Sequence, residues 1–100
     1  CEEIWKRAIA IAGNRVHVDF DMDVCDRAVV PGCPAAAPGG ISADEIRQYA
    51  FLVGASKHVT SVDITEIDAT QDSQDERTIR LAALVALEVL AGLSTRKVAP

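Results

Sequence analysis

The chain has 100 residues, of which 49% are hydrophobic and 4% aromatic, and its formal net charge is −5. This length predicts one domain or part of one, with a modest core built mainly from alanine, valine and isoleucine. The acidic balance argues against a nucleic-acid surface, and no apolar run is long enough to cross a bilayer. The three cysteines, Cys1, Cys25 and Cys33, come without a secretory signal, which indicates reduced thiols in a cytoplasm. We do not expect Cys25 and Cys33 to form a disulfide.

The first two predicted elements are a helix and a strand. Apolar residues that recur at helical spacing predict a helix over residues 2–12. Residues 15–20 are rich in β-branched side chains and predict a strand. His17 lies on this strand. We expect a buried histidine that is hydrogen-bonded within the sheet, and a metal-ligand role is the less favoured alternative.

Three acids, Asp19, Asp21 and Asp23, alternate at the end of this strand. If the strand ran through them, they would project from one face, because side chains of a strand alternate. Buried like charges need compensation, and a divalent cation bound by carboxylate oxygens is the economical explanation. A solvated loop of acids after a short strand is the alternative, and spacing alone leaves the two equally open.

A long connection and a second helix follow. Residues 24–41 contain three prolines, and loops of this length inside compact domains are usually functional. Within this loop Arg27 stands beside Asp26, and it is expected either to form a surface ion pair there or to contact a substrate carboxylate at the mouth of a cleft. A capping box at residues 42–45 opens a helix that runs to about Gly54.

The last third of the chain predicts a second strand and a third helix. Residues 59–66 form the strand, with Glu66 at its carboxyl end. Asp63 is expected to be a packed, hydrogen-bonded acid, or else a group that contacts the metal ligands without binding the metal itself. A polar loop over residues 68–75 leads to a helix over residues 76–93, whose broad apolar arc predicts heavy burial.

The order helix, strand, helix, strand, helix implies parallel strands joined by helical crossovers, and hence an α/β fold. Since two strands do not form a stable sheet alone, we expect residues 1–100 to be the C-terminal part of a single larger domain. In open parallel sheets, ligands bind at the carboxyl ends of the strands. Asp21, Asp23 and Glu66 are all expected at that edge.

The segment from Asp19 to Gly40 resembles the ureohydrolase family, which includes arginase, agmatinase and formimidoylglutamase. The family motif runs from an aromatic residue through Asp-x-Asp-x-x-Asp to Pro-Gly-Gly, and the matching residues here are Phe20, Asp21, Asp23, Asp26, Pro31, Gly32, Pro38, Gly39 and Gly40. A second family motif, Asp-Ile-x-Glu-Val-Asn, is matched by residues 63–68. The resemblance extends from about Val16 through the last helix. It implies an arginase-like three-layer α/β/α fold, with a parallel sheet and helices on both faces.

The resemblance also implies a chemistry. Ureohydrolases hold two manganese ions, which bridge and acidify a water, and the resulting hydroxide cleaves a C–N bond of a small guanidine or amidine substrate. Asp21 would bridge the two ions, Asp23 would bind one, and Glu66 would receive the cationic group of the substrate. Asp26 would organise the loop or support the metal ligands. The other ligands and the proton-shuttling histidine have no counterpart, so we assign no catalytic residue and expect the isolated chain to be inactive.

Departures from the family motif bear on the substrate. Asp19 replaces a serine, Arg27 replaces a proline, and Cys33-Pro34-Ala35 replaces the Thr-Gly-Thr of the loop. Because Arg27 suits a substrate with carboxylates, we favour formimidoylglutamate, with agmatine or a guanidino-acid close behind. The alternatives are a noncatalytic ureohydrolase-like subunit and an acidic metal-binding module of another α/β fold. The resemblance further suggests a homo-oligomer.

Overall fold

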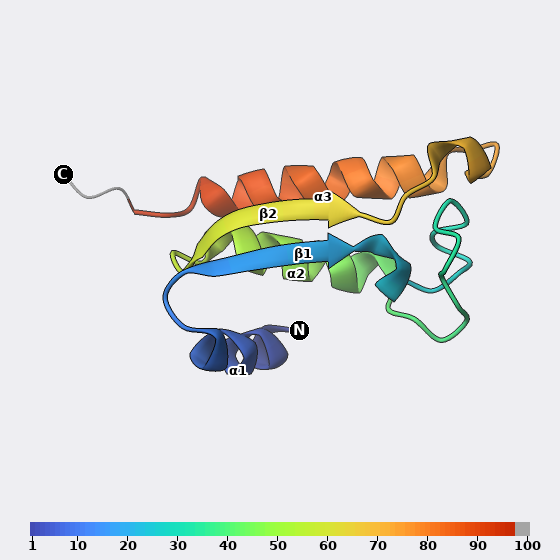
Figure 1. The fold of residues 1–100 in the computed structure, drawn as a ribbon. Helices are drawn as coiled ribbons and strands as arrows, with labels where there is room; N and C mark the ends of the chain where they lie inside the picture. The colour runs from blue at the N-terminus through green and yellow to red at the C-terminus, as the bar shows by residue number, and fades with distance from the viewer. Residues whose placement is uncertain (98–100) are drawn as a thin grey trace.

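The structure is a computed structural model that describes residues 1–97, and it has the predicted order of helices and strands (Figure 1). The elements are α1 (Glu2–Ala12), β1 (Val16–Asp21), η1 (Met22–Val24), α2 (Ala43–Ala55), β2 (Val59–Thr65), η2 (Ala69–Gln71) and α3 (Arg77–Leu93). The labels η1 and η2 denote single 3-10 turns that follow the two strands. The last residues of the predicted domain, 98–100, lie outside the described part of the chain.

Helix α2 begins with the predicted capping box. The Ser42 Oγ accepts a hydrogen bond from the Glu45 amide, and the Glu45 Oε1 accepts one from the Ser42 amide, each at 3.1 Å. These bonds satisfy amide groups that the first turn of a helix leaves without partners. The start of α2, and with it the end of the long loop, is therefore fixed by local sequence.

Strands β1 and β2 form a parallel two-stranded sheet, as predicted. Asp19 lies beside Asp63 and Asp21 lies beside Thr65, so the two strands end at the same level. Figure 1 shows both arrowheads pointing toward the end of the molecule at which the loop after β1 and the turn η2 lie. The parallel arrangement thus brings the carboxyl ends of both strands to one edge, where the predicted site residues are located.

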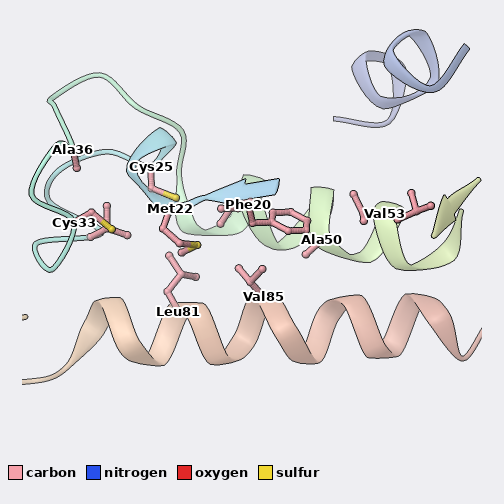
Figure 2. Packing of buried hydrophobic residues seen from close by; sticks show 12 residues of the cluster. Phe20, Met22, Cys25, Cys33, Ala36, Ala50, Val53, Leu81 and Val85 are labelled. Carbon is pink, nitrogen blue, oxygen red and sulfur yellow. The ribbon is translucent and has the colours of Figure 1, made fainter. Parts of the chain in front are cut away.

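The core lies between the sheet and the helices α2 and α3 (Figure 2). Phe20 of β1 and Met22 of η1 are buried in one cluster with Ala50 of α2 and with Leu81 and Val85 of α3. Burying a side chain of this size contributes about 1.5–3 kcal/mol, so the end of β1 is held firmly against the helices. The loop after β1 adds four hydrophobic residues to this core, Cys25, Val30, Cys33 and Ala36. Both of these cysteines are free thiols.

Helices α2 and α3 pack closely because glycines lie at their crossing. A Cβ at Gly54 would lie 2.0 Å from the carbonyl oxygen of Val89, and a Cβ at Gly92 would lie 2.1 Å from that of Phe51. No side chain fits into such gaps, so the absence of a Cβ is what allows the backbones to touch. Arg96 Nε also donates a hydrogen bond to the Gly54 carbonyl oxygen at 2.7 Å.

The helices are more exposed than the sequence predicts. In α3 the apolar arc buries Leu81 and Val85, but Leu84 and Leu93 are 37% and 45% exposed. The prediction of heavy burial for α3 is therefore wrong for this segment, because periodicity identifies an apolar arc without saying how much of it meets a partner. In α1, Ile11 is 89% exposed. None of the helices in residues 1–97 is long and apolar enough to span a membrane.

Candidate metal and substrate site

Strand β1 ends at Asp21, before it reaches Asp23. The Asp21 Oδ1 accepts a hydrogen bond from the Asp23 amide at 3.2 Å, and this bond caps the turn η1. Short aspartate side chains often bond to the backbone two residues on, which competes with an extended conformation. The predicted common face of Asp19, Asp21 and Asp23 is therefore wrong for Asp23, which lies on the turn.

The acids at the two strand ends nevertheless lie close enough to influence one another. A side-chain hydrogen bond with Asp21 is the main cause that raises the pKa of Asp23, and desolvation and the charges of Asp21, Glu66 and Asp19 add to it. Burial raises the pKa of the Cys33 thiol to about 11, and the charges of Asp23 and Asp21 contribute there as well. Carboxylates from both strands therefore converge at one edge of the sheet.

Glu66 occupies an unusual backbone conformation. It is predicted to be the last residue of the second strand, but β2 ends at Thr65, and Glu66 has a φ of 71° in the left-handed region. This conformation costs a residue with a Cβ about 1–2 kcal/mol. Such residues persist where the surrounding contacts hold them, and they concentrate at functional sites. The Glu66 side chain is exposed, so its carboxylate is accessible.

Asp26 holds the long loop closed. Its Oδ2 accepts a hydrogen bond from the Ala28 amide at 3.0 Å, and its Oδ1 accepts one from the Gly39 amide at 2.7 Å. These donors, Ala28 first, lower the pKa of Asp26. At the same place a Cβ on Gly40 would lie 2.5 Å from the Asp26 amide nitrogen, so the two ends of the loop are in direct backbone contact. Asp26 therefore organises the loop that follows β1.

Arg27 bonds to its own loop and not to Asp26. Its Nη1 donates to the carbonyl oxygens of Cys33, Pro34 and Ala36 at 3.2, 3.0 and 3.4 Å. The alternative of an Arg27–Asp26 ion pair is wrong, since none of the ion pairs in residues 1–97 joins them. In the same part of the chain, the Nε and Nη2 of Arg27 have no protein acceptor. One edge of the guanidinium therefore remains available to a ligand.

The face of the sheet opposite the core carries polar side chains. His17 Nδ1 lies 2.7 Å from Ser61 Oγ, and His17 Nε2 lies 3.4 Å from Asp63 Oδ2. The predicted hydrogen bond of His17 within the sheet is confirmed, but its predicted burial is wrong, and Asp63 is not packed either: the two side chains are 52% and 50% exposed. A hydrogen bond with Asp19 raises the pKa of Asp63, and Thr65 Oγ1 donates to Asp19 Oδ1 at 3.0 Å.

A cavity of ≈ 450 Å³ adjoins Asp21. It lies between α1, β1 and α2, and its lining is apolar or aromatic, as at Trp5 and Tyr49, apart from Asp19 and Asp21. These walls offer few partners to a charged ligand. The polar chemistry is therefore confined to the ends of the strands.

Asp21 and Asp23 fit part of a metal site. Their carboxylate oxygens are the hard donors that Mn²⁺, Mg²⁺ and Ca²⁺ prefer. A cation would also relieve the repulsion that contributes to the raised pKa of Asp23. Within residues 1–97, however, no three His, Cys, Asp or Glu side chains are grouped so as to hold a metal ion. A complete site would need ligands in addition to those that the described chain offers.

Two further residues, Asp72 and Thr78, hold the loops in place. Asp72 caps α3, since its Oδ1 and Oδ2 accept hydrogen bonds from the amides of Thr78 and Ile79 at 3.3 and 3.0 Å. Thr78 is completely buried, and its Oγ1 accepts a hydrogen bond from the Gly32 amide at 2.9 Å. Thr78 has the helical spacing of the buried Leu81, and this pattern is the signal that would have identified it as a buried polar residue.

Comparisons with known sequences agree with this arrangement. The sequence model of the arginase family matches residues 1–92. The formimidoylglutamase of Halalkalibacterium halodurans is 44% identical over 77 residues, which cover 77% of this chain and 24% of the relative. The formimidoylglutamase of Bacillus subtilis is 38% identical over 78 residues, which cover 78% of this chain and 24% of the relative. The chain thus spans about a quarter of the length of these relatives.

Solved structures match over nearly the whole chain. The crystal structure of formimidoylglutamase from Bacillus subtilis superposes with a TM-score of 0.84 at 32% identity, covering 97% of this chain and 30% of that one. A crystal structure of Trypanosoma cruzi formiminoglutamase with Mn²⁺ superposes with a TM-score of 0.89 at 25% identity, covering 95% of this chain and 32% of that one. These matches confirm the predicted α/β fold of the arginase type. The chain belongs to the arginase family.

Proposed function

We propose that this chain is part of a binuclear-manganese hydrolase that cleaves a C–N bond of a linear amidine or guanidine. The observation that carries the proposal is the convergence of Asp21, Asp23 and Glu66 at one edge of the sheet, in a chain 44% identical to a formimidoylglutamase over 77 residues. A Mn²⁺-containing relative with the same fold supports the choice of metal.

In this proposal two of the acids bind the metal and a third binds the substrate. Asp21 and Asp23 would hold manganese, and bound manganese would supply a Lewis acid that activates water for hydrolysis at neutral pH. Glu66 binds the cationic amidine or guanidine group through charge-assisted hydrogen bonds. Asp26 would support the site by holding the loop after β1 through its bonds to the Ala28 and Gly39 amides, and Asp63 through its contacts with Asp19 and His17.

Formimidoylglutamate is the substrate that we favour. With Nη1 bound to loop carbonyl oxygens, Arg27 can keep its other edge for a substrate carboxylate. Formimidoylglutamate carries such carboxylates, whereas agmatine has none. A guanidino-acid, which has both a cationic group and a carboxylate, is the second candidate. Two relatives at 44% and 38% identity are formimidoylglutamases, which supports the same choice.

The first test is metal uptake by the longest form of the protein that carries this sequence. We expect about two Mn²⁺ per chain, and Asp21→Asn or Asp23→Asn should weaken manganese binding by about tenfold or more, because each removes a charged ligand. Asp44→Asn is the control, since Asp44 is an exposed acid on α2. Metal content and calorimetric titration are the measurements. Uptake by both site variants equal to that of wild type would rule out this metal site.

The second test is turnover of formimidoylglutamate, guanidino-acids and agmatine in the presence of manganese. The measurement is the release of formamide or urea. Glu66→Gln should lower kcat/KM about 10- to 150-fold, which corresponds to the loss of a hydrogen bond between charged groups. Glu76→Gln is a matched control, because Glu76 is also exposed and also has a positive φ, 56°. If wild type turns over none of these substrates, the hydrolase proposal is wrong and a noncatalytic family member remains.

The proposed setting is a homo-oligomer in the cytoplasm that acts on a small molecule, without a nucleic-acid or membrane partner. Residues 1–100 alone should be inactive. The reason is that Asp21 and Asp23 supply only part of a ligand set within the described residues.

A further inference from the structure

The loop after β1 is joined to the chain after β2 at Gly32. The Gly32 amide donates a hydrogen bond to Thr78 Oγ1 at 2.9 Å, and the Gly32 carbonyl oxygen accepts one from the Asp68 amide at 2.8 Å. Thr78 is 0% exposed, and Gly32 is buried as well. Water therefore cannot replace the Thr78 hydroxyl, and removing it would leave a buried amide without a partner.

Space at this junction is limited. A Cβ at Gly32 would lie 3.2 Å from the Thr78 Cβ and Oγ1 and 3.3 Å from the Asp68 carbonyl oxygen. Asp68 is itself anchored, because its Oδ1 accepts hydrogen bonds from the amide and the hydroxyl of Thr70 at 3.0 and 2.6 Å. The junction therefore holds the two chain segments at a defined separation.

On the side of β1, short turns connect the junction to the metal-binding acids. The Cys33 amide donates to the Val30 carbonyl oxygen at 3.0 Å, and the Val30 amide donates to the Asp26 carbonyl oxygen at 3.2 Å. Val30 and Cys33 are completely buried. A shift of Gly32 would therefore be transmitted to Asp26 and then to Asp23, only three residues earlier in the chain.

On the side of β2, the connection is shorter still. Asp68 follows Glu66 by two residues, and the left-handed φ of 71° at Glu66 requires that its neighbours be held in place. A second hydrogen bond lies near the junction: Arg77 Nη1 of α3 donates to the Ala28 carbonyl oxygen of the loop after β1 at 3.2 Å. The first turn of α3 thus bonds to the β1 loop at two points.

We propose that Thr78 is a positioning residue that sets the distance between Glu66 and the acids Asp21 and Asp23 through its bond to Gly32. The inference rests on the proposed function, because it concerns the geometry of the same site. A substrate group bound by Glu66 must meet the metal-activated water at a defined distance, and a displacement of about 1 Å costs up to about 100-fold in rate. Since Thr78 is completely buried, it acts through Gly32 and not by contact with a ligand.

Thr78→Val is the decisive substitution, because it keeps the shape of the side chain and removes the hydroxyl. In the longest form of the protein with manganese, we expect kcat for formimidoylglutamate to fall about fivefold or more, with the manganese content of wild type. Thr78→Ser keeps the hydroxyl and should keep kcat within about twofold of wild type. Val85→Ala removes buried packing from the same helix, and it should lower the thermal midpoint without changing kcat.

Amide hydrogen exchange tests the junction without turnover. Thr78→Val should accelerate exchange at both Gly32 and Asp68, whereas Val85→Ala should not single out these amides. If Thr78→Val lowers only the thermal midpoint and leaves kcat and the Asp68 exchange rate unchanged, Thr78 is a packing residue and the inference is overturned. If wild type has no hydrolase activity, the proposed function fails. Faster Asp68 exchange would then still support the coupling of the loops, and an unchanged rate would refute it.

Discussion

Two backbone amides, those of Ala28 and Gly39, donate to the Asp26 carboxylate and lower its pKa. A carboxyl group whose pKa is lower in the folded state stabilises the fold above its unfolded pKa of about 3.9. That stabilisation is lost as the pH falls through the folded pKa. We therefore expect Asp26→Asn to lower the thermal midpoint at about pH 7, and we expect this difference from wild type to shrink below about pH 4.

Thermal unfolding followed by circular dichroism across this pH range is the measurement. Asp44→Asn is again a suitable control, since within residues 1–97 the Asp44 carboxylate accepts only a side-chain hydrogen bond, from Gln48 Nε2 at 2.8 Å. A difference between wild type and Asp26→Asn that stayed constant into strong acid would argue against the hydrogen bonds as the source of the stabilisation.

At the scale of single residues, the alternation of acids predicts three carboxylates near the end of β1 but not how each is held. The bond between the Asp23 amide and the Asp21 carboxylate ends the strand earlier than the pattern suggests. The Thr78–Gly32 bond joins residues 46 positions apart. No local pattern of hydrophobic and polar residues predicts such a contact.

At the scale of secondary-structure elements, the crossing of α2 and α3 offers a clear test. An alanine in the interior of an exposed helix is more stabilising than a glycine by about 1 kcal/mol. At Gly92 the added Cβ would lie 2.1 Å from the Phe51 carbonyl oxygen, so the helices would have to separate. We expect Gly92→Ala to destabilise the fold by about 1–3 kcal/mol, the usual cost of overpacking.

Urea unfolding of Gly92→Ala gives the sign directly, because helix propensity and steric conflict predict opposite changes in the free energy of unfolding. Ala91→Ser, at the exposed neighbouring position, is the control and should change that free energy by less than about 0.5 kcal/mol. A stabilised Gly92→Ala variant would show that the close crossing does not constrain the helices.

The elements themselves were largely predictable. Residues 2–12 form a helix as predicted, and the capping box at residues 42–45 opens α2, because helix periodicity and capping are local properties. The error at α3 concerns burial. Its exposed Leu84 and Leu93 belong to the predicted apolar arc, and their burial depends on which other parts of a protein pack there.

At the scale of the whole molecule, the fold was predictable because two motifs in the correct order identified a family, and the structural matches confirm that family's fold. Which face of the sheet the helices cover was less predictable. His17 and Asp63 lie on an open polar face, whereas the core forms on the side of α2 and α3. Alternation separates two faces of a strand, but it does not say which one is covered.

The left-handed backbone of Glu66 has a consequence for how this family member evolves or is engineered. Glycine would adopt that conformation without steric conflict, so a glycine at this position would favour stability. Selection for stability alone would therefore tend to replace Glu66. If Glu66 binds a cationic substrate group as we propose, the acid at this position trades thermal stability for recognition of a positively charged molecule.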